Sequence, residues 1–451
     1  MAKSLDRTKL KSLLEKEEAL FHKTHPKSYQ LYQRAKKSLH GGVPMLWMIR
    51  WAGSFPVFVK EAKGAHFTDV DGNSYIDFCL GDTGAMTGHA PTATVDAIKN
   101  QIEKGITLML PYEDVIWVGE ELQCRFKLPY WQFALTATDA NRFALRMSRL
   151  LTGRQKILVF NYCYHGSVDE TFITLDEEGT PMSRPNNMGP QVNPLQTTKV
   201  IEFNDIGALE TALSARDVAA VLAEPVMTNI GIIHPQKGYH DALREMTRKY
   251  GTYLIIDETH TICTSPGGYS ASFDLQPDFL TLGKPLAGGV PAAVYGFTEE
   301  VSQAFTEKLN IEDADVGGIG GTLAGNALSI AAMKATLQNV LTEEFYTKAI
   351  ALQEKFTAGV ESVSQEFELP WIVKQLGNRS EYWFRPTPPK NGGEAHAAID
   401  SELDRYMHLF ALNRGILMTP FHNMALISPE TTQEDVDYHT KIFREAVETL
   451  M

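Results

Sequence analysis

Cysteine is scarce in this chain. Only four are present among 451 residues, namely Cys79, Cys124, Cys163 and Cys263. Their spacing matches neither a metal-ligand motif nor a disulfide framework. We therefore expect no metal site and no cysteine-stapled fold, and we expect a reducing, cytoplasmic environment.

Long apolar runs and basic runs are missing as well. No segment approaches the roughly 18 consecutive apolar residues that a membrane-spanning helix needs, and residues 1–39 lack the apolar core of a secretion signal. The formal net charge is −13, so neither a membrane nor a nucleic acid is an expected partner. The hydrophobic content of 43% is enough for a large core, which a chain of this length divides between two domains.

One lysine follows a short apolar strand. Residues 279–282 lead through Gly283 to Lys284, just before a Gly-rich bend at 287–289. A lysine ammonium with its ordinary pKa of about 10.4 is unreactive, so a lysine that forms a Schiff base needs a site that favours the neutral amine or the imine. Most lysines are simply solvated. Pro285 fixes its own φ and predicts extended backbone at Lys284.

A second strand end carries carboxylates. Residues 253–256 are typical of a buried parallel strand, and they end in Asp257 and Glu258. The carboxyl ends of such strands face a ligand crevice, although an isolated apolar-Asp-Glu string more often caps a turn. A lysine imine and a carboxylate that keeps a pyridine nitrogen protonated are the two protein groups that pyridoxal phosphate (PLP) needs as an electron sink.

Further strands end in polar or aromatic residues. The apolar run 219–223 leads into 224–231, and the run 157–160 leads into 161–166. The run 133–135 is followed by small and hydroxylated residues that open a helical pattern. Such a turn presents backbone N–H groups and Thr hydroxyls to an anion, while an ordinary helix N-cap is the alternative.

The order of these segments resembles the class III aminotransferases of fold type I, and within them the glutamate-1-semialdehyde 2,1-aminomutase-like branch. The resemblance begins at 41–43, continues through 64–73 and 88–89, includes the strand ends above, and reaches 320–326. It implies an α/β fold. The expected large PLP-binding domain, 86–330, has a mostly parallel central sheet flanked by helices, and residues 1–85 and 331–451 form a smaller α+β domain.

The resemblance also implies roles for individual residues. Lys284 carries the internal aldimine and moves a proton, while Asp257 pairs with the pyridine nitrogen. The expected cofactor-binding residues are Ala137 and Thr138 at the phosphate, Tyr164 at the ring face with His165 adjoining it, Glu224 and Asn229 near the ring and its oxygen, Asp257, Lys284, and Thr322 at the phosphate of a neighbouring subunit in a homodimer with shared active sites. For Glu224 a structural salt bridge is an equal alternative.

The sequence departs from the family pattern in the phosphate turn. Residues 136–140 read Thr-Ala-Thr-Asp-Ala where the family usually has Ser-Gly-Ser/Thr-Glu-Ala. Met227 stands where many members carry Gln, and Thr259 stands where Val is usual. None of these changes removes a required group, but the altered turn predicts weaker phosphate binding. Farther on, Thr431 and Glu434 are expected to form a capping box at the start of the last helix.

Substrate recognition is less well defined by the sequence. Arg50, flanked by Trp47 and Trp51, is a candidate for binding a substrate carboxylate, and a surface arginine packed on tryptophan is the alternative. The aromatic residues suggest a bulky or aromatic amine, or a β-amino acid.

The resemblance predicts a PLP-dependent aminotransferase that moves an amino group from an amine or amino-acid donor to a keto-acid acceptor. An aminomutase or an amino-acid racemase of the same fold is the alternative. A non-catalytic PLP-binding protein is a third interpretation.

Overall fold

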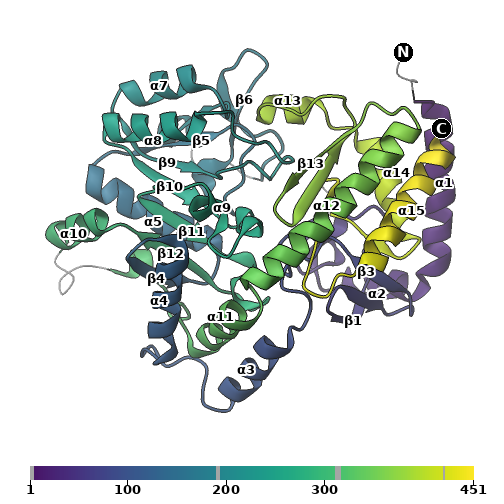
Figure 1. Cartoon of the computed structure of the whole chain (residues 1–451), viewed down its shortest axis with the longest axis horizontal. Coiled ribbons are helices and arrows are strands. Elements are labelled where there is room, and N and C mark those ends of the chain that lie inside the picture. The colour runs from purple at the N-terminus through teal and green to yellow at the C-terminus, as the bar shows by residue number, and fades with distance from the viewer. Residues whose placement is uncertain (1–4, 189–192, 310–315, 420–421) are drawn as a thin grey trace. The chain divides into compact units, whose positions relative to one another are not determined.

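The computed structural model describes residues 5–188, 193–309, 316–419 and 422–451. The chain forms two compact units (Figure 1). The small unit comprises Met1–Pro91, Thr347–Pro388 and Ala398–Met451, and the large unit comprises Thr92–Tyr346 and Pro389–Ala397.

The unit boundaries differ from those expected from the sequence. The division expected at 330/331 falls inside helix α11 (Ala327–Asn339), which packs against α3 (Thr92–Ile102) within the large unit. The division expected at 85/86 falls before Pro91, where the first segment of the small unit ends. The excursion Pro389–Ala397 returns to the large unit.

The large unit contains a seven-stranded sheet of order β4-β12-β11-β10-β9-β5-β8. Its strands are β4 (Tyr130–Ala134), β5 (Lys156–Phe160), β8 (Thr198–Ile201), β9 (Val218–Ala223), β10 (Tyr253–Asp257), β11 (Phe279–Leu282) and β12 (Ala293–Phe297). The five strands from β11 to β8 run parallel, and β12 is antiparallel to both its neighbours. Every residue of β9 is buried, as expected for a parallel strand covered on both faces. The predicted α/β architecture with a mostly parallel sheet is confirmed.

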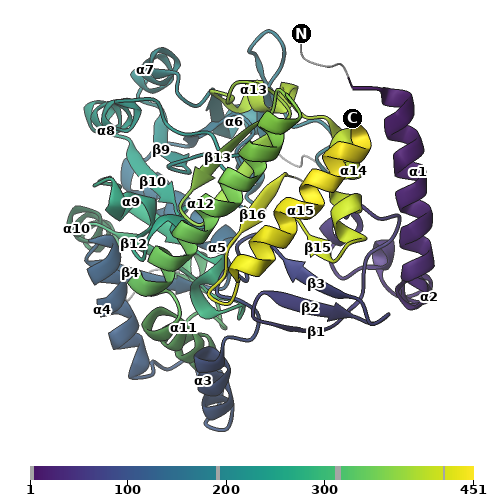
Figure 2. The ribbon, with the colours of Figure 1, turned by 45° about the vertical axis from the view of Figure 1, so that its right-hand side comes forward.

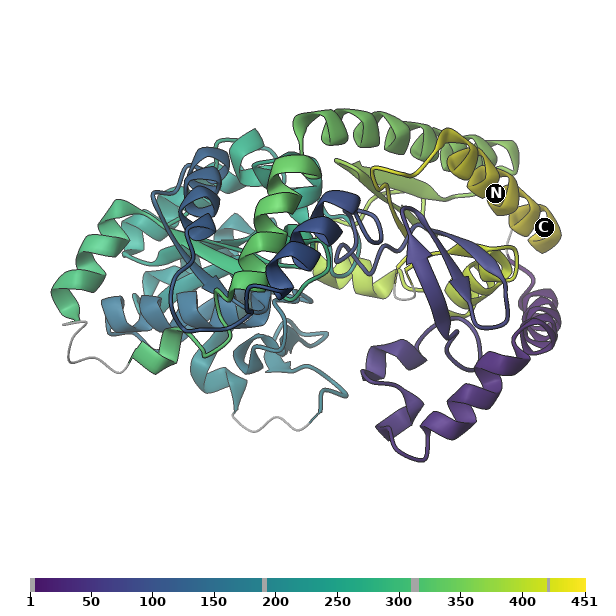
Figure 3. The ribbon, with the colours of Figure 1, turned by 90° about the horizontal axis from the view of Figure 1, so that it is seen from below.

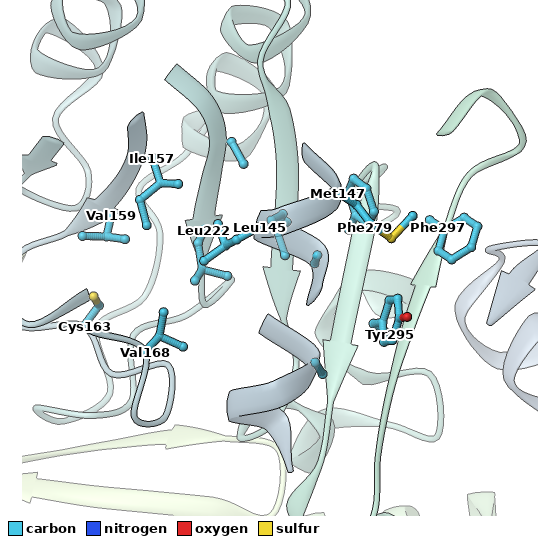
Figure 4. Close-up of a cluster of buried hydrophobic side chains, with 14 of the residues drawn as sticks. Leu145, Met147, Ile157, Val159, Cys163, Val168, Leu222, Phe279, Tyr295 and Phe297 are labelled. Atoms are coloured by element: carbon cyan, nitrogen blue, oxygen red, sulfur yellow. The ribbon is translucent and has the colours of Figure 1, made fainter. Parts of the chain in front are cut away.

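Helices cover this sheet. The remaining elements of the large unit are α4 (Asp114–Phe126), α5 (Ala137–Thr152), α6 (Pro194–Thr197), α7 (Ile206–Ser214), α8 (Tyr239–Tyr250), α9 (Gly268–Ser272), α10 (Glu299–Lys308), α13 (Gly392–Ala397), the hairpin β6 (Ile173–Leu175) and β7 (Pro181–Ser183), and short 3-10 turns η3 (Asp169–Thr171), η4 (Thr261–Thr264), η5 (Lys284–Ala287) and η6 (Val316–Ile319). Leu145 and Met147 of α5 share a buried cluster with Leu222 of β9 and Phe279 of β11 (Figure 4). This packing fixes α5 against the sheet, with its first turn close to the end of β11.

The small unit combines two sheets with long helices. One sheet has the order β1-β2-β3-β15, and the other has the order β13-β14-β16. The elements are α1 (Arg7–Thr24), α2 (Pro26–Ala35), η1 (His40–Gly42), η2 (Leu46–Ile49), β1 (Val59–Lys63), β2 (His66–Asp69), β3 (Ser74–Asp77), α12 (Glu343–Glu366, which begins in the large unit), β13 (Ile372–Leu376), β14 (Arg379–Trp383), α14 (Ser401–Leu412), β15 (Ile416–Leu417), β16 (Met424–Leu426) and α15 (Gln433–Leu450). Helices α12 and α15 lie side by side (Figures 2 and 3).

The last helix begins one residue later than predicted. Its capping box joins Thr432 and Asp435 in place of Thr431 and Glu434: the Thr432 amide donates to the Asp435 carboxylate at 2.8 Å, while the Thr431 hydroxyl accepts from the Ser428 amide at 2.9 Å. Within the ranges that the structure describes, no helix is long and apolar enough to cross a membrane.

Candidate active site

Asp257 is the centre of a buried hydrogen-bond network in the large unit. Its Oδ2 accepts hydrogen bonds from Asn141 Nδ2 and His165 Nδ1, both at 2.9 Å, and its Oδ1 accepts one from the Thr259 amide at 3.1 Å. The side chains of His165 and Asp257 are 0% and 5% exposed. The carboxylate is therefore held in one orientation at the end of β10.

The electrostatics of this pair favour two opposite charges. Burial alone raises the pKa of Asp257, but the hydrogen bond and charge of His165 outweigh it and lower that pKa to about 2. Burial alone lowers the pKa of His165, but the neighbouring Cys163 sulfur and the Asp257 carboxylate raise it to about 10. At neutral pH the site therefore contains a fixed carboxylate backed by an imidazolium.

Asn141 and Thr281 complete the network. The Thr281 hydroxyl donates to Asn141 Oδ1 at 2.6 Å, which turns the Asn141 amide nitrogen toward Asp257 and the His165 carbonyl. Both side chains belong to residues that are fully buried. Sequence reasoning missed these two residues. The available signal was a single hydroxyl inside the otherwise apolar strand Phe279–Leu282.

Lys284 lies at the end of the neighbouring strand. Strands β10 and β11 pair Asp257 with Thr281, so the segments that follow them emerge next to each other. Lys284 Nζ is 2.8 Å from His260 Nε2. The backbone of Lys284 is left-handed, with φ 46°, so the extended geometry expected from Pro285 is wrong. The turn η5 begins at Lys284 itself, and its tertiary packing overrides the local preference that Pro285 imposes on the residue before it.

The first turn of α5 lies beside this lysine. The N-cap Thr136 accepts a hydrogen bond from the Asp139 amide at 3.2 Å, and the first intrahelical bond runs from the Ala140 amide to the Thr136 carbonyl at 3.1 Å. The amides of Ala137 and Thr138 precede that bond, as the first amides of any helix do. A Cβ added to Gly283 would lie 3.1 Å from the Ala137 side chain. Glycine therefore allows the Lys284 loop to approach the helix N-terminus.

Gly166 forms the other wall of this turn. The Ser167 amide donates to Thr138 Oγ1 at 3.0 Å. Gly166 has φ +77°, and a Cβ there would lie only 2.0 Å from Thr138 Oγ1. The residues thus form a tight backbone cradle at a helix N-terminus, which suits a phosphate dianion. A cofactor that carries both a phosphate and an aldehyde fits these residues, because the cradle and Lys284 lie together.

The remaining predicted cofactor residues occupy the loops after β5 and β9. Tyr164 is half-buried between Cys163 and His165. Asn229 Nδ2 donates to the Tyr162 carbonyl at 2.9 Å, which ties the two loops together. The Glu224 carboxylate accepts hydrogen bonds from the amide (3.1 Å) and the hydroxyl of Thr228, so it closes the turn that follows β9.

Four further predicted residues lie on other segments of the chain. Thr322 is exposed in the turn that precedes α11 of the large unit. Trp47 is 40% exposed in η2 of the small unit, with Arg50 exposed and Trp51 half-buried just after it. The structure brings together Lys284, Asp257, His165 and the phosphate-turn residues, and the roles of all the predicted site residues remain proposals.

Comparison with known proteins agrees with this geometry. A family model described as aminotransferase class-III matches residues 47–447. The chain belongs to the class III aminotransferase family, and it is a PLP-dependent enzyme of fold type I.

Curated relatives and solved structures narrow the likeness to one branch. The chain is 32% identical to a glutamate-1-semialdehyde 2,1-aminomutase of Desulfitobacterium hafniense, over 94% of this chain and 98% of the relative. A crystal structure of a glutamate-1-semialdehyde-aminomutase from Pseudomonas aeruginosa PAO1 is 47% identical, with a TM-score of 0.97 and full coverage of both chains. A variant of that protein was solved in complex with PMP. An omega-transaminase from Sphaerobacter thermophilus is 26% identical, with a TM-score of 0.85 over 94% of this chain and 97% of the transaminase.

Proposed function

We propose that the protein is a PLP-dependent aminomutase that moves an amino group between neighbouring carbons of one small molecule, with glutamate 1-semialdehyde as the first candidate substrate. The observation that carries the proposal is the convergence of Lys284, the Asp257–His165 pair and the α5 cradle at one edge of the sheet. The choice of an aminomutase is supported by the 47% identity to the Pseudomonas aeruginosa aminomutase.

Each residue has a distinct task in this proposal. PLP, when bound, supplies an aldehyde and an electron sink. Lys284 holds and moves a proton at Nζ, and Asp257 presents a fixed negative charge to the pyridine nitrogen. The amides of Ala137 and Thr138 bind the phosphate, while Tyr164 covers the ring face.

Transfer to a separate keto acid is the second candidate. The sequence resemblance predicts this activity, and the 26% identity to an omega-transaminase supports it. The same catalytic groups serve both reactions, because each begins with removal of a proton beside an amino group. The two differ in whether the amino group returns to the same molecule.

The test is to incubate the PLP-loaded protein with glutamate 1-semialdehyde and no keto acid. We expect the isomer that carries the amino group on carbon 1 in place of carbon 2, detected by chromatography and mass spectrometry. Lys284→Ala is the control and should form no isomer while keeping the circular dichroism of the parent. If product appears only when pyruvate or 2-oxoglutarate is supplied with an amino-acid donor, the transaminase reading replaces the proposal.

We also propose that the enzyme works as a homodimer in the cytoplasm, with Thr322 reaching the phosphate bound by the partner. Support comes from apolar side chains on the segment 102–116 of the large unit. Leu108, Met109 and Leu110 are 58%, 76% and 68% exposed, and exposed apolar clusters of this kind mark interaction surfaces. Light scattering after size-exclusion chromatography measures the mass. A monomer at working concentration contradicts the proposal.

A further inference from the structure

Residues 389–397, the α13 segment, pack on the large unit although the chain on both sides of them belongs to the small unit. Two glycines allow a close approach. A Cβ at Gly392 would lie 2.1 Å from the Asn161 carbonyl oxygen, and a Cβ at Gly393 would lie 2.6 Å from Glu202 Oε1. Only glycine fits this closely without a shift of its neighbours. The α13 segment therefore lies directly on the loops that follow β5 and β8.

Hydrogen bonds hold the α13 segment in this position. The Glu202 carboxylate accepts from Asn161 Nδ2 at 2.6 Å and from the Gly393 amide at 3.3 Å. At the start of the segment, Asn204 Nδ2 donates to the Lys390 carbonyl at 2.8 Å. These contacts connect the backbone of the segment to side chains that follow β5 and β8. The segment can therefore serve as a fixed support for a side chain that packs on it.

The side chain that packs on this support is Tyr162. The rings of Tyr162 and His396 are stacked, with 4.3 Å between their centroids and 17° between their planes. Tyr162 has a left-handed backbone, with φ 61°, and its carbonyl accepts from Asn229 Nδ2 at 2.9 Å. A tyrosine keeps this backbone only where its surroundings hold it. The stack and the Asn229 hydrogen bond together therefore fix the turn at Tyr162.

The turn at Tyr162 sets the course of the loop 161–166. Farther along this loop lies Tyr164, which is proposed to cover the cofactor ring. The loop ends at Gly166, which lies against Thr138 in the phosphate cradle. A shift at Tyr162 would therefore change the binding of both the ring and the phosphate.

We propose that His396 is a positioning residue for the cofactor: by stacking on Tyr162 it holds the loop 161–166 in the conformation that binds PLP. This role deepens the proposed function and rests on the task given there to Tyr164. An aromatic pair changes the equilibrium between two conformations by about 2- to 10-fold. Loss of the stack should shift the loop toward other conformations by this factor, and PLP should bind more weakly to the same extent.

Hydrogen exchange of the cofactor-free protein, followed by mass spectrometry, tests whether the stack holds the loop. The Cys163 amide donates to the Phe160 carbonyl at 3.0 Å, so the peptide that contains 161–166 reports opening of the loop. Exchange of this peptide should be about 2- to 10-fold faster in His396→Ala than in the wild type. His396→Phe keeps a planar ring and should exchange at nearly the wild-type rate.

Lys390→Ala is the matched control on the same segment. Lys390 contributes its backbone carbonyl to the packing, and its side chain is exposed. This variant should match the wild type both in hydrogen exchange of the loop and in PLP affinity.

A spectrophotometric titration with PLP tests the coupling to the cofactor. PLP should bind about 2- to 10-fold more weakly to His396→Ala, and about as tightly to His396→Phe as to the wild type. Because coupling between two sites is reciprocal, saturating PLP should slow hydrogen exchange of residues 389–397 in the wild type by at least this factor. A contact that only stabilised the fold would give no such dependence on PLP.

Gly392→Ala displaces the α13 segment at its other end. The added Cβ would meet the Asn161 carbonyl oxygen at 2.1 Å, whereas alanine favours a helix more than glycine does. The segment should therefore stay helical but shift, and PLP binding should weaken at least as much as in His396→Ala. Gly119→Ala in α4, where open space surrounds the glycine, should bind PLP as the wild type does.

Two results would overturn the proposal. Unchanged exchange of the loop in His396→Ala means that the stack does not hold it. Faster exchange with unchanged PLP affinity means that the position of the loop does not govern cofactor binding. A wild-type protein that forms no isomer from glutamate 1-semialdehyde contradicts the proposed function, whereas hydrogen exchange and the PLP titration still decide the role of His396.

Discussion

Replacement of His165 by Phe should destabilise the large unit in a pH-dependent way. The change keeps an aromatic ring in the buried site but removes the group that donates to Asp257 at 2.9 Å. Asp257 keeps its bonds from Asn141 and the Thr259 amide, yet its charge loses the imidazolium. The carboxylate would then be buried without a counter-charge.

The size of the effect follows from the two pKa shifts. Lowering the pKa of Asp257 from 3.8 to about 2 corresponds to about 2.5 kcal/mol, and raising that of His165 from 6.5 to about 10 corresponds to about 5 kcal/mol. The two energies differ because the pKa of His165 is also raised by Cys163. The Asp257 value of about 2.5 kcal/mol is therefore the better lower bound for the free energy of the His165–Asp257 interaction. Breaking a buried pair typically costs about 3–5 kcal/mol. We expect a loss of about 2–5 kcal/mol.

The two residues lose their stabilising contributions at opposite ends of the pH range. The raised pKa of His165 stabilises the fold fully below about pH 6.5, and this contribution is lost as pH rises through about 10. The lowered pKa of Asp257 stabilises it above about pH 4, and that contribution is lost as pH falls through about 2. The difference in unfolding free energy between wild type and variant is therefore largest from about pH 4 to 6.5 and shrinks toward pH 10.

Urea unfolding of the cofactor-free proteins at pH 5, 6.5, 8 and 9.5 measures this difference. His240→Phe is the matched control in the same unit, because burial lowers the pKa of His240 and its Nε2 donates only to the Pro225 carbonyl among the described residues, at 2.8 Å. We expect this control to lose about 1 kcal/mol, unchanged between pH 7 and 9.5. A His165→Phe loss that is equally large at every pH would refute the ion-pair argument.

Two further substitutions test the site. Gly166→Ala should weaken PLP binding at least about tenfold in a spectrophotometric titration, because its Cβ would meet Thr138 Oγ1 at 2.0 Å and a lost phosphate contact is worth about 1.4 kcal/mol or more. Gly179→Ala is the control, because Gly179 has the same φ of +77° but open space around it, so this variant has the backbone strain without the clash. Equal weakening of PLP binding in both variants would contradict the argument from the Thr138 contact. Thr281→Val should cost about 1–3 kcal/mol of unfolding free energy, because Asn141 Oδ1 loses its donor, whereas Thr281→Ser should restore most of it.

The sequence was sufficient to predict Lys284 and Asp257 as candidates, because both follow apolar strands and parallel strands end at one edge of a sheet. The sequence was not sufficient to predict which side chains contact these residues or support them. The contact between His260 and Lys284 depends on the register of β10 and β11, and the contact between Thr281 and Asn141 joins residues far apart in the chain. Such pairs are set by tertiary packing, which no local pattern records.

Local preferences also failed where packing opposed them. Pro285 favours extended backbone before it, yet Lys284 has φ 46°. The boundary expected at residue 330 divides α11, whose buried face belongs to the large unit. Both errors arise from judging a segment without the elements that surround it.

The left-handed backbone of Lys284 has one more implication. A side chain other than glycine costs roughly 1–2 kcal/mol in this conformation, so the main chain at this position would be more stable with glycine than with lysine. The backbone conformation therefore gives the chain no reason to retain a lysine at residue 284. The lysine is therefore kept against the preference of its own backbone, so what holds it at this position is what its side chain does.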